Sequence, residues 1–330
     1  METKIRRKSC DFAEISCLYS IRHGILKTIH AGGSSRRGKR CSMQLSNVSD
    51  LKSLLARHGF SFSKGLGQNF IVSPSVCPRM ADACCLSPEK SGVVEIGPGI
   101  GVLTRELALR ARQVVSLELD TRLFPILEET LADLPNVTVL HADAMKTDFA
   151  TLLREQLDGC EDLCVCANLP YYITSPILMK LLEARLPLRA VTVMVQKEAA
   201  ERLTAEVGSR QAGAVTVAVR YFSVPERLFS VPRGCFLPPP NVDSAVIRLT
   251  LRHDAAQPGF DERLFFRLVR AGFEQRRKTL CNALGSAGIP KEAVCRALGH
   301  LDLPSTVRAE ALRMEFWQAL AAELAEFSQE

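Results

Sequence analysis

The sequence predicts an α/β protein, in which a mainly parallel sheet with helices on both faces precedes a small all-helical C-terminal domain. Two observations support this fold class. From about residue 92 to 200, short apolar runs alternate with amphipathic stretches, as in strands joined by crossover helices. Beyond about residue 252, the apolar residues recur only with helical spacing. We therefore expect two folded domains, at 43–251 and 252–330.

The apolar runs predict five strands in the alternating region and a sixth after three consecutive prolines at 238–240. These strands are 93–96, 114–118, 137–141, 163–167, 190–195 and 244–251. Together with the last of these strands, a helical, turn-rich stretch is expected to close the domain. A capped helix is predicted to begin at Ser49-Asp50 and to end at Gly59. Further helices are expected at 102–111, 123–132, 176–183, 262–273, 277–284, 291–298 and 312–326.

The positive charge of the chain is concentrated at its N-terminus. Residues 1–42 hold ten Lys and Arg and three acids, so their net charge is +7. The whole chain has a net charge of +6, so residues 43–330 carry −1. This segment could be a basic RNA-binding tail, a mitochondrial transit peptide or an extension from a misplaced start codon. We favour Met43 as the natural start and expect 1–42 to be disordered. Affinity of the folded part for nucleic acid must then come from local patches.

Twelve cysteines do not form a pattern that indicates disulfides or zinc. No CxxC occurs, and Cys164 and Cys166 fall on one face of a predicted strand, pointing into the core. We expect buried reduced thiols, no metal site and a cytoplasmic protein, with a mitochondrial location as the alternative. No apolar run approaches the ~20 residues of a membrane helix, so no membrane partner is expected.

A glycine cluster follows the first predicted strand and opens a helix. Glycines at such a turn let a ligand approach the backbone closely. The dinucleotide pattern G-x-G-x-x-G fails here, because after Gly97 and Gly99 the third glycine is Gly101, one residue too early. A glycine loop without the phosphate-binding spacing fits a nucleoside that lacks phosphates. We therefore predict S-adenosyl-L-methionine as the cofactor.

Two acids end the next two predicted strands. Glu118 can accept hydrogen bonds from both ribose hydroxyls, and Asp143 can accept one from an adenine amine. Each acid alone would be an ordinary solvated carboxylate. Ligands of parallel sheets bind beyond the carboxyl ends of the strands, so the glycine cluster and the two acids together favour a cofactor site.

The sequence Asn168-Leu169-Pro170-Tyr171 follows the fourth predicted strand. An aromatic exocyclic amine is a poor nucleophile, because its lone pair is delocalised into the ring. The Asn168 side-chain oxygen and the backbone carbonyl before the proline can accept from its N–H groups, and Tyr171 offers a flat surface for the ring. We expect this turn to hold a target base, although a proline turn with a core tyrosine would read the same in isolation.

These motifs belong to a longer series that identifies a family. The series comprises 67–70 (GQNF), 94–99 (VEIGPG), 168–171 (NLPY), 196–198 (QKE), 236–246 (FLPPPNVDSAV) and 273–280 (FEQRRKTL). From about residue 57 to 315, the chain resembles the rRNA adenine N6,N6-dimethyltransferases. It is more similar to the small-subunit, kasugamycin-resistance type than to the macrolide-resistance type, which usually has Ile at the position of Leu169 and lacks the last motif.

The resemblance implies a Rossmann-like class I S-adenosylmethionine-dependent methyltransferase sheet. It also implies cofactor contacts from Asn69, Ile71, Gly97, Glu118, Asp143 and Asn168. The target would be two adjacent adenosines in a hairpin loop near the 3′ end of small-subunit (16S) rRNA, within an immature ribosomal subunit, and each would receive two methyl groups. The departures are Ile71, where Leu is usual, and the extra N-terminus.

As a mechanism, we expect Asn168 Oδ1 and the Leu169 carbonyl to accept from the adenine N6 hydrogens. Tyr171 would stack on the base and Phe236 would cover its other face. The target has to leave its stack first. Because 43–330 is nearly neutral, the local density of Arg276, Arg277 and Lys278 at the predicted start of a helix favours phosphate contacts, against the alternative of a solvated face.

Two other functions fit the sequence less well. A non-enzymatic ribosome-assembly factor would be favoured by a degraded glycine loop or a lost Asn168, and neither occurs. A DNA adenine methyltransferase usually has two prolines after its Asp or Asn, which Leu169 argues against. We expect the protein to act as a monomer.

Overall fold

A computed structural model of the chain describes residues 28–30, 45, 47–63, 65, 67–253 and 259–327. The chain divides into two compact units, Met1–Asn168 with Cys235–Pro239, and Leu169–Gly234 with Pro240–Glu330. The division into these units does not test the predicted domain boundary near residue 252, which stays a prediction. Of the N-terminal segment 1–42, only residues 28–30 are described, so the three explanations of this segment stay predictions.

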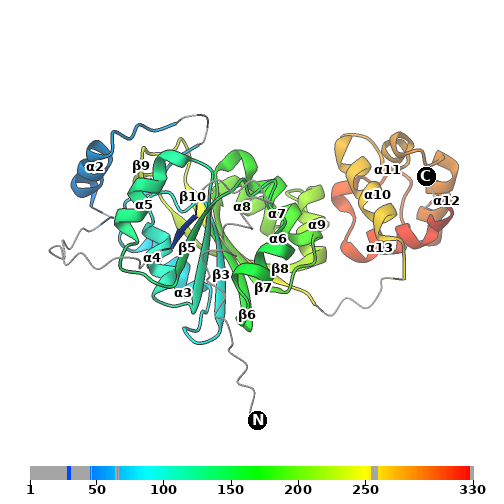
Figure 1. The fold of residues 1–330 in the computed structure, drawn as a ribbon. Coiled ribbons are helices and arrows are strands. Elements are labelled where there is room, and N and C mark those ends of the chain that lie inside the picture. The colour runs from blue at the N-terminus through cyan, green and yellow to red at the C-terminus, as the bar shows by residue number, and fades with distance from the viewer. Residues whose placement is uncertain are drawn as a thin grey trace, which may run out of the picture. The chain divides into compact units, whose positions relative to one another are not determined.

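The first unit is built on strands that lie in the order β1-β5-β4-β3-β6 (Figure 1). Four of them are parallel, namely β3 (Ser91–Ile96), β4 (Gln113–Glu118), β5 (Val137–His141) and β6 (Asp162–Asn168). Every residue of β3 is buried, as expected of a central strand covered on both faces. The register sets Ile96 beside both Leu117 and Ala167, so the carboxyl ends of β3, β4 and β6 meet at one edge.

One short strand contradicts an expectation about the N-terminus. Residues Thr28–His30 form β1, which pairs antiparallel with β5. The prediction that 1–42 is disordered is therefore wrong at these three residues. An edge strand of a parallel sheet readily accepts such an antiparallel neighbour, because its outer backbone groups otherwise lack a partner.

Helices and one small extra sheet complete the first unit. The helices are α2 (Val48–Arg57), α3 (Val76–Ala83), α4 (Val102–Ala108), α5 (Phe124–Thr130) and α6 (Phe149–Gln156), with a 3-10 turn η2 at Thr121–Leu123. The small sheet joins β2 (Phe70–Ile71) to β9 (Phe236–Leu237), segments far apart in the sequence. Helix α2 is capped by the Asn47 side chain, which accepts from Ser49 N at 2.8 Å. The predicted start at Ser49-Asp50 was therefore slightly late, because the cap lies two residues earlier.

The second unit contains a group of antiparallel strands. Its strands β7 (Leu188–Gln196), β10 (Ser244–Leu251) and β8 (Ser223–Val231) lie in this order. Helix α7 (Thr174–Glu183) precedes β7, and α8 (Lys197–Thr204) and α9 (Ala214–Phe222) connect β7 to β8. Strand β8 corrects the expectation that only a helical, turn-rich stretch accompanies the strand at 244–251. Its side chains are mostly exposed or half-buried, so it lacks the apolar run by which the other strands were predicted.

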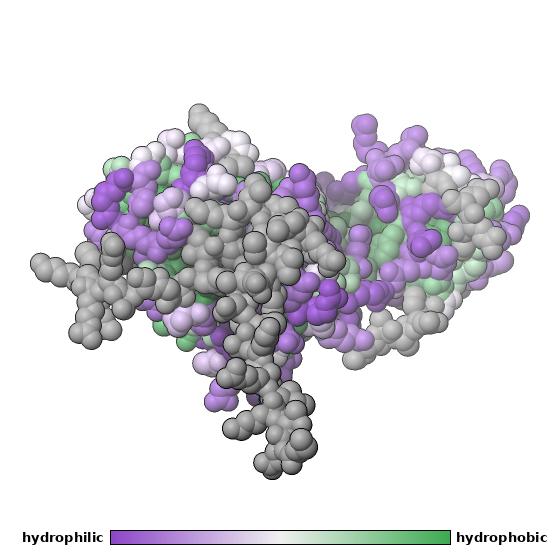
Figure 2. All heavy atoms as spheres, viewed as in Figure 1, coloured by the Kyte–Doolittle hydropathy of each residue, from purple (hydrophilic) through white to green (hydrophobic). Residues whose placement is uncertain are grey.

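Four helices form the C-terminal part of the second unit, coloured orange to red in Figure 1. They are α10 (Glu262–Glu274), α11 (Leu280–Ala283), α12 (Lys291–His300) and α13 (Met314–Glu323). Trp317 is fully buried in their shared core. Gly272 of α10 permits this packing, because a Cβ there would lie 2.8 Å from the Trp317 ring. Figure 2 shows hydrophilic side chains over much of the visible surface of these helices.

Candidate active site

The glycine turn after β3 adopts a backbone conformation that only glycine takes easily. Gly97, Gly99 and Gly101 have φ of +72°, +59° and +87°. A Cβ at Gly97 would meet nothing within 4 Å, whereas one at Gly99 would press on the Phe70 ring at 3.2 Å. The backbone at Gly97 therefore faces open space that a ligand can enter, and the remaining glycines allow the turn to pack closely.

Glu118 ends β4 and is almost fully buried, with 6% of its surface exposed. Its Oε1 accepts from Asp120 N at 2.8 Å, and its Oε2 accepts from Gly99 N at 3.3 Å. Burial raises the pKa of Glu118 to about 7, against the opposing effect of these two backbone N–H groups. The carboxylate is thus tied to the glycine turn.

Asp143 follows β5, the strand beside β4. Because Glu118 lies opposite His141 in the register, the two acids leave neighbouring strands at the same edge. Asp143 Oδ1 accepts from Met145 N at 2.9 Å, and its Oδ2 lies 3.8 Å from Lys146 Nζ. Its side chain is 29% exposed. Asp143 is therefore both oriented by the following turn and accessible to a ligand.

Asn168, at the end of β6, contacts another predicted cofactor residue. Its Nδ2 donates to the backbone carbonyl of Asn69 at 3.2 Å, across 99 residues of sequence. The Asn69 side chain in turn donates to the Gly67 carbonyl at 3.1 Å. This arrangement occupies the NH₂ end of the Asn168 amide and leaves Oδ1 to accept from a ligand.

Ile71 and Phe236 lie opposite each other in the small sheet of β2 and β9. Both side chains are buried, with 5% and 4% of their surfaces exposed. The sequence predicted roles for both, but nothing in it indicated that they pair. Within the first unit, the structure thus joins Asn69 to Asn168, Ile71 to Phe236, and the glycine turn to Glu118.

One connection to this site was missed in the sequence. Gln68 donates to Asp120 Oδ2 at 2.8 Å, two residues beyond Glu118, and accepts from Ser63 N at 3.1 Å. Asp120 also binds Arg122 at 2.6 Å. These bonds fix the segment before β2 to the end of β4. The GQNF motif was a signal that this segment matters, but its partner 52 residues away is not visible in the sequence.

The rest of the tetrapeptide belongs to the second unit. The Leu169 N–H donates to the Met194 carbonyl at 3.3 Å, and the Pro170 carbonyl accepts from Ile173 N at 3.2 Å. The Tyr171 hydroxyl lies 2.9 Å from Ser244 Oγ, which is fully buried. Burial raises the pKa of Tyr171 above its usual value. Both ends of the turn are thus held by hydrogen bonds, and the tyrosine ring has a fixed hydroxyl end.

A second buried acid precedes the glycine turn. Glu95 is 1% exposed and accepts from the Ser116 hydroxyl at 2.7 Å, while its Oε1 has no hydrogen-bond partner. Burial raises the pKa of Glu95 to about 7, and the Ser116 hydrogen bond opposes this effect. Its environment therefore favours the protonated form up to neutral pH.

The basic segment differs from its prediction. Gln275 to Lys278 form a turn between α10 and α11, so the predicted helix start at Arg277 is wrong. The turn closes with Lys278 N donating to the Gln275 carbonyl at 2.8 Å. Arg276 donates to the carbonyls of Arg210 and Ala212 at 3.0 and 3.1 Å and to Glu310 at 3.1 Å.

These contacts give Arg276 a structural function within the second unit. Arg277 and Lys278 are exposed in the same turn. Arg267, on the preceding helix, donates to the Phe327 carbonyl and is likewise engaged. The three predicted phosphate contacts are thus not equivalent: among the described residues, the Arg276 side chain is bound to the fold, whereas those of Arg277 and Lys278 are exposed without such contacts.

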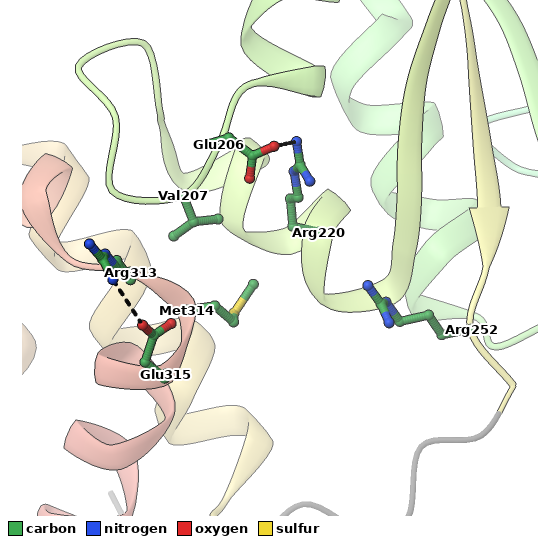
Figure 3. A pocket seen from close by; sticks show the side chains of 7 residues that line it. All are labelled: Glu206, Val207, Arg220, Arg252, Arg313, Met314 and Glu315. Carbon is green, nitrogen blue, oxygen red and sulfur yellow. Dashed lines mark hydrogen bonds and ion pairs between the residues drawn. The ribbon is translucent and has the colours of Figure 1, made fainter.

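A cavity of about 420 Å³ lies in the second unit, and none of the residues that line it is a predicted site residue. Figure 3 shows its lining side chains, which are Glu206, Val207, Arg220, Arg252, Arg313, Met314 and Glu315. Glu206 pairs with Arg220 at 2.6 Å, and Arg313 lies 3.9 Å from Glu315. The charges in this cavity therefore largely compensate one another.

The residues of the first unit fit the predicted cofactor. The open backbone at Gly97 and the buried Glu118 carboxylate suit a ribose, and Asp143 can accept from an amine. Over the described ranges, no group of three or more His, Cys, Asp and Glu side chains could hold a metal ion. No helix within those ranges has the length and apolar character needed to cross a membrane.

Comparison with known proteins identifies a matching family and similar proteins. Residues 59–325 match the family described as "Ribosomal RNA adenine dimethylase". Two curated relatives are named "Ribosomal RNA small subunit methyltransferase A". The one from Bacillus licheniformis is 45% identical over 280 residues, which cover 83% of this chain and 95% of the relative. The one from Geobacillus sp. (strain WCH70) is 46% identical over 274 residues, covering 82% and 94%.

Two solved structures share the fold. A dimethyladenosine transferase from Plasmodium falciparum matches with a TM-score of 0.65 and 26% identity, covering 78% of this chain and 98% of its own. The 23S rRNA methyltransferase ErmE matches with a TM-score of 0.60 and 31% identity, covering 78% and 99%. These likenesses confirm the predicted class I methyltransferase fold. With the family match over most of its length, the chain belongs to the ribosomal RNA adenine dimethylases.

Proposed function

We propose that the protein uses S-adenosyl-L-methionine to dimethylate N6 of two adjacent adenosines in the 3′-terminal hairpin loop of small-subunit (16S) rRNA. It acts on an immature subunit and so contributes to small-subunit biogenesis. The names of the curated relatives, which refer to the small ribosomal subunit, support the choice of small-subunit rRNA as the substrate. The observation that carries the chemistry is the Asn168 amide, anchored through its NH₂ group to the Asn69 carbonyl with Oδ1 left to accept.

The methyl donor would be held by the first unit. Glu118 accepts from the ribose hydroxyls, Asp143 accepts from the adenine amine, and Gly97 allows the close approach of the ligand. Asn69 and Ile71 line the site from the segment that Asn168 anchors. When bound, S-adenosylmethionine supplies a methyl group that is already strongly electrophilic, so positioning and exclusion of water provide most of the catalysis.

The target amine is aligned by the tetrapeptide. Asn168 Oδ1 and the Leu169 carbonyl accept from the two N6 hydrogens, which localises the nitrogen lone pair. Tyr171 offers its ring to the base. Phe236 of the first unit is assigned a further contact with the base. No strong general base is needed, because the methylated nitrogen becomes acidic and can lose its proton to water.

The RNA backbone would be bound by the turn between α10 and α11. Arg277 and Lys278 contact phosphates, whereas Arg276 holds the turn against Glu310. Reversing the charge of Arg277 and Lys278 should weaken RNA binding and flatten its salt dependence, by a slope of about one per lost phosphate contact. An unchanged slope would assign these residues to the solvated surface.

The protein would act as a monomer in the cytoplasm, with the mitochondrial form of the family as the alternative. N-terminal sequencing of the native protein distinguishes these locations. A native chain that begins at Met43 supports the cytoplasmic assignment, and one cleaved within 1–42 supports the mitochondrial one.

The catalytic proposal is tested with Asn168→Ala and a matched control. Asn136 is also part-buried and donates to two backbone carbonyls, those of Ala108 at 2.8 Å and Ala111 at 3.0 Å, but has no catalytic role in this proposal. We expect Asn168→Ala to lose methyl transfer at saturating substrates, and Asn136→Ala to lose stability while keeping kcat below its melting temperature. Full turnover by Asn168→Ala would remove the role given to this side chain.

A further inference from the structure

Two cysteines of the C-terminal helices lie close to bonding distance. Cys281 on α11 and Cys295 on α12 are fourteen residues apart in sequence, and their Sγ atoms are 2.7 Å apart. A disulfide has an S–S length of about 2.05 Å, so closure requires a movement of well under 1 Å. We propose that Cys281 and Cys295 are a site of reversible disulfide formation, oxidised by low-molecular-weight disulfides such as glutathione disulfide.

The local structure lets the two sulfurs close this gap. Helix α11 is only four residues long and continues as a 3-10 turn, Leu284–Ala287. Gly288, with φ of +79°, then reverses the chain before α12 begins at Lys291. Short elements joined by a glycine turn adjust more easily than two long packed helices, because fewer backbone hydrogen bonds must move with them.

The different exposure of the two thiols sets the order of the reaction. Cys281 is buried, with 2% of its surface exposed, whereas Cys295 is half-buried and reachable from solvent. Burial, followed by the neighbouring Cys295, raises the pKa of Cys281 to about 11, and Lys291 opposes this effect. Cys295 is therefore the thiol that an oxidant meets first.

The exchange proceeds in two balanced steps. The Cys295 thiolate attacks one sulfur of glutathione disulfide, forming a mixed disulfide and releasing one glutathione thiolate. The Cys281 sulfur, once deprotonated, attacks Cys295 Sγ, which forms the intramolecular bond and releases the second glutathione. The protein loses two hydrogens and two electrons, and the glutathione disulfide gains both. An excess of reduced glutathione or another thiol reverses the sequence.

A second pair of neighbouring thiols is expected not to form a disulfide, because an oxidant cannot reach it. Cys166 of β6 interacts with Cys84, which raises the pKa of Cys166 together with its burial. Both side chains are completely buried, with 0% of their surfaces exposed. A glutathione molecule cannot reach either sulfur in the folded protein. This pair should stay reduced and serves as an internal control for accessibility.

The test uses the full chain, folded and without denaturant, in glutathione buffers of graded ratio. Remaining thiols are blocked with N-ethylmaleimide, and peptides are mapped by mass spectrometry. We expect a linked peptide pair joining Cys281 to Cys295, its loss after dithiothreitol, and alkylatable Cys84 and Cys166 after unfolding. Exposed Cys85 reports that the oxidant is active, by becoming glutathionylated.

Two variants test the order of the steps. Cys281→Ser should trap glutathione on Cys295, and Cys295→Ser should leave Cys281 as a free thiol. The wild-type map alone decides the proposal if either variant fails to fold. A stable glutathione adduct on Cys295 of the wild type, or free Cys281 and Cys295 while Cys85 is modified, would overturn it.

Discussion

Lowering the pH from 7 to 6 should weaken the binding of S-adenosylmethionine about fivefold, because the free protein holds a proton on Glu118 that the ligand must displace. Burial raises the pKa of Glu118 to about 7 from 4.5. The ribose hydroxyls donate hydrogen bonds, so they bind the ionised carboxylate and lower its pKa in the complex. Protonation of the free protein therefore competes with the ligand as pH falls below 7.

The structure sets the size of this effect. With a pKa of about 7, Glu118 is about nine-tenths protonated at pH 6, so binding there should release close to one proton. Below pH 6 the fall in affinity approaches tenfold per pH unit until the pKa of the complex is reached, and above about pH 8 the affinity levels off. Isothermal titration calorimetry in two buffers with different ionisation enthalpies measures both the affinity and the proton release.

Two variants assign the proton to one residue. Glu118→Gln removes the titrating group, so its binding should be weaker at pH 8 and independent of pH between 6 and 8. Glu95→Gln removes the other acid whose pKa is raised to about 7 and should keep the linkage, because Glu95 contacts Ser116 rather than the ligand. Pronounced pH dependence in Glu118→Gln, or none in the wild type, would refute the reasoning.

Three further predictions concern stability and catalysis. Between pH 4.5 and 7 the folded state keeps a proton on Glu95 that the unfolded state has lost, so the free energy of unfolding falls as pH rises. Glu95→Gln has no titrating group there, so urea titrations should show the fall between pH 4.5 and 7 to be about 3 kcal/mol smaller than in the wild type. Gly97→Ala and Gly101→Ala both strain a backbone with positive φ, but Gly101→Ala should be the less stable, because its Cβ also meets the Leu131 side chain at 2.9 Å. Gly97→Ala meets nothing within 4 Å and should in addition weaken cofactor binding; equal melting temperatures would contradict this. Tyr171→Phe should cost about 1 kcal/mol of stability by leaving the buried Ser244 hydroxyl unpaired, yet keep methyl transfer, which Tyr171→Ala should lose.

Strands with continuous apolar runs could be predicted closely from the sequence. The predicted 137–141 and 244–251 coincide with β5 and β10. Strand β8 was missed because it lies at the end of its strand order, paired only with β10. An edge strand tolerates polar side chains and a proline such as Pro225, and these features hide it from a search for apolar runs.

The candidate site divides along the same line. The glycine turn and the acids at the strand ends follow from local pattern, so the positions of Gly97, Glu118 and Asp143 in the fold could be predicted. The contacts of Gln68 and Asn168 join segments 52 and 99 residues apart, which no local pattern contains. The helix expected to start at Arg277 fails for a similar reason, because tertiary hydrogen bonds of the preceding arginine hold the chain in a turn.

The most direct test of the central claim is to map the methylated bases after the protein acts on immature small subunits. The substrate is prepared from cells that lack the endogenous enzyme, and labelled S-adenosylmethionine is supplied. We expect dimethylation at N6 of two adjacent adenosines near the 3′ end of the small-subunit rRNA, with Asn168→Ala inactive on the same particles. Label in large-subunit rRNA, or at another position of the small-subunit rRNA, would contradict the account.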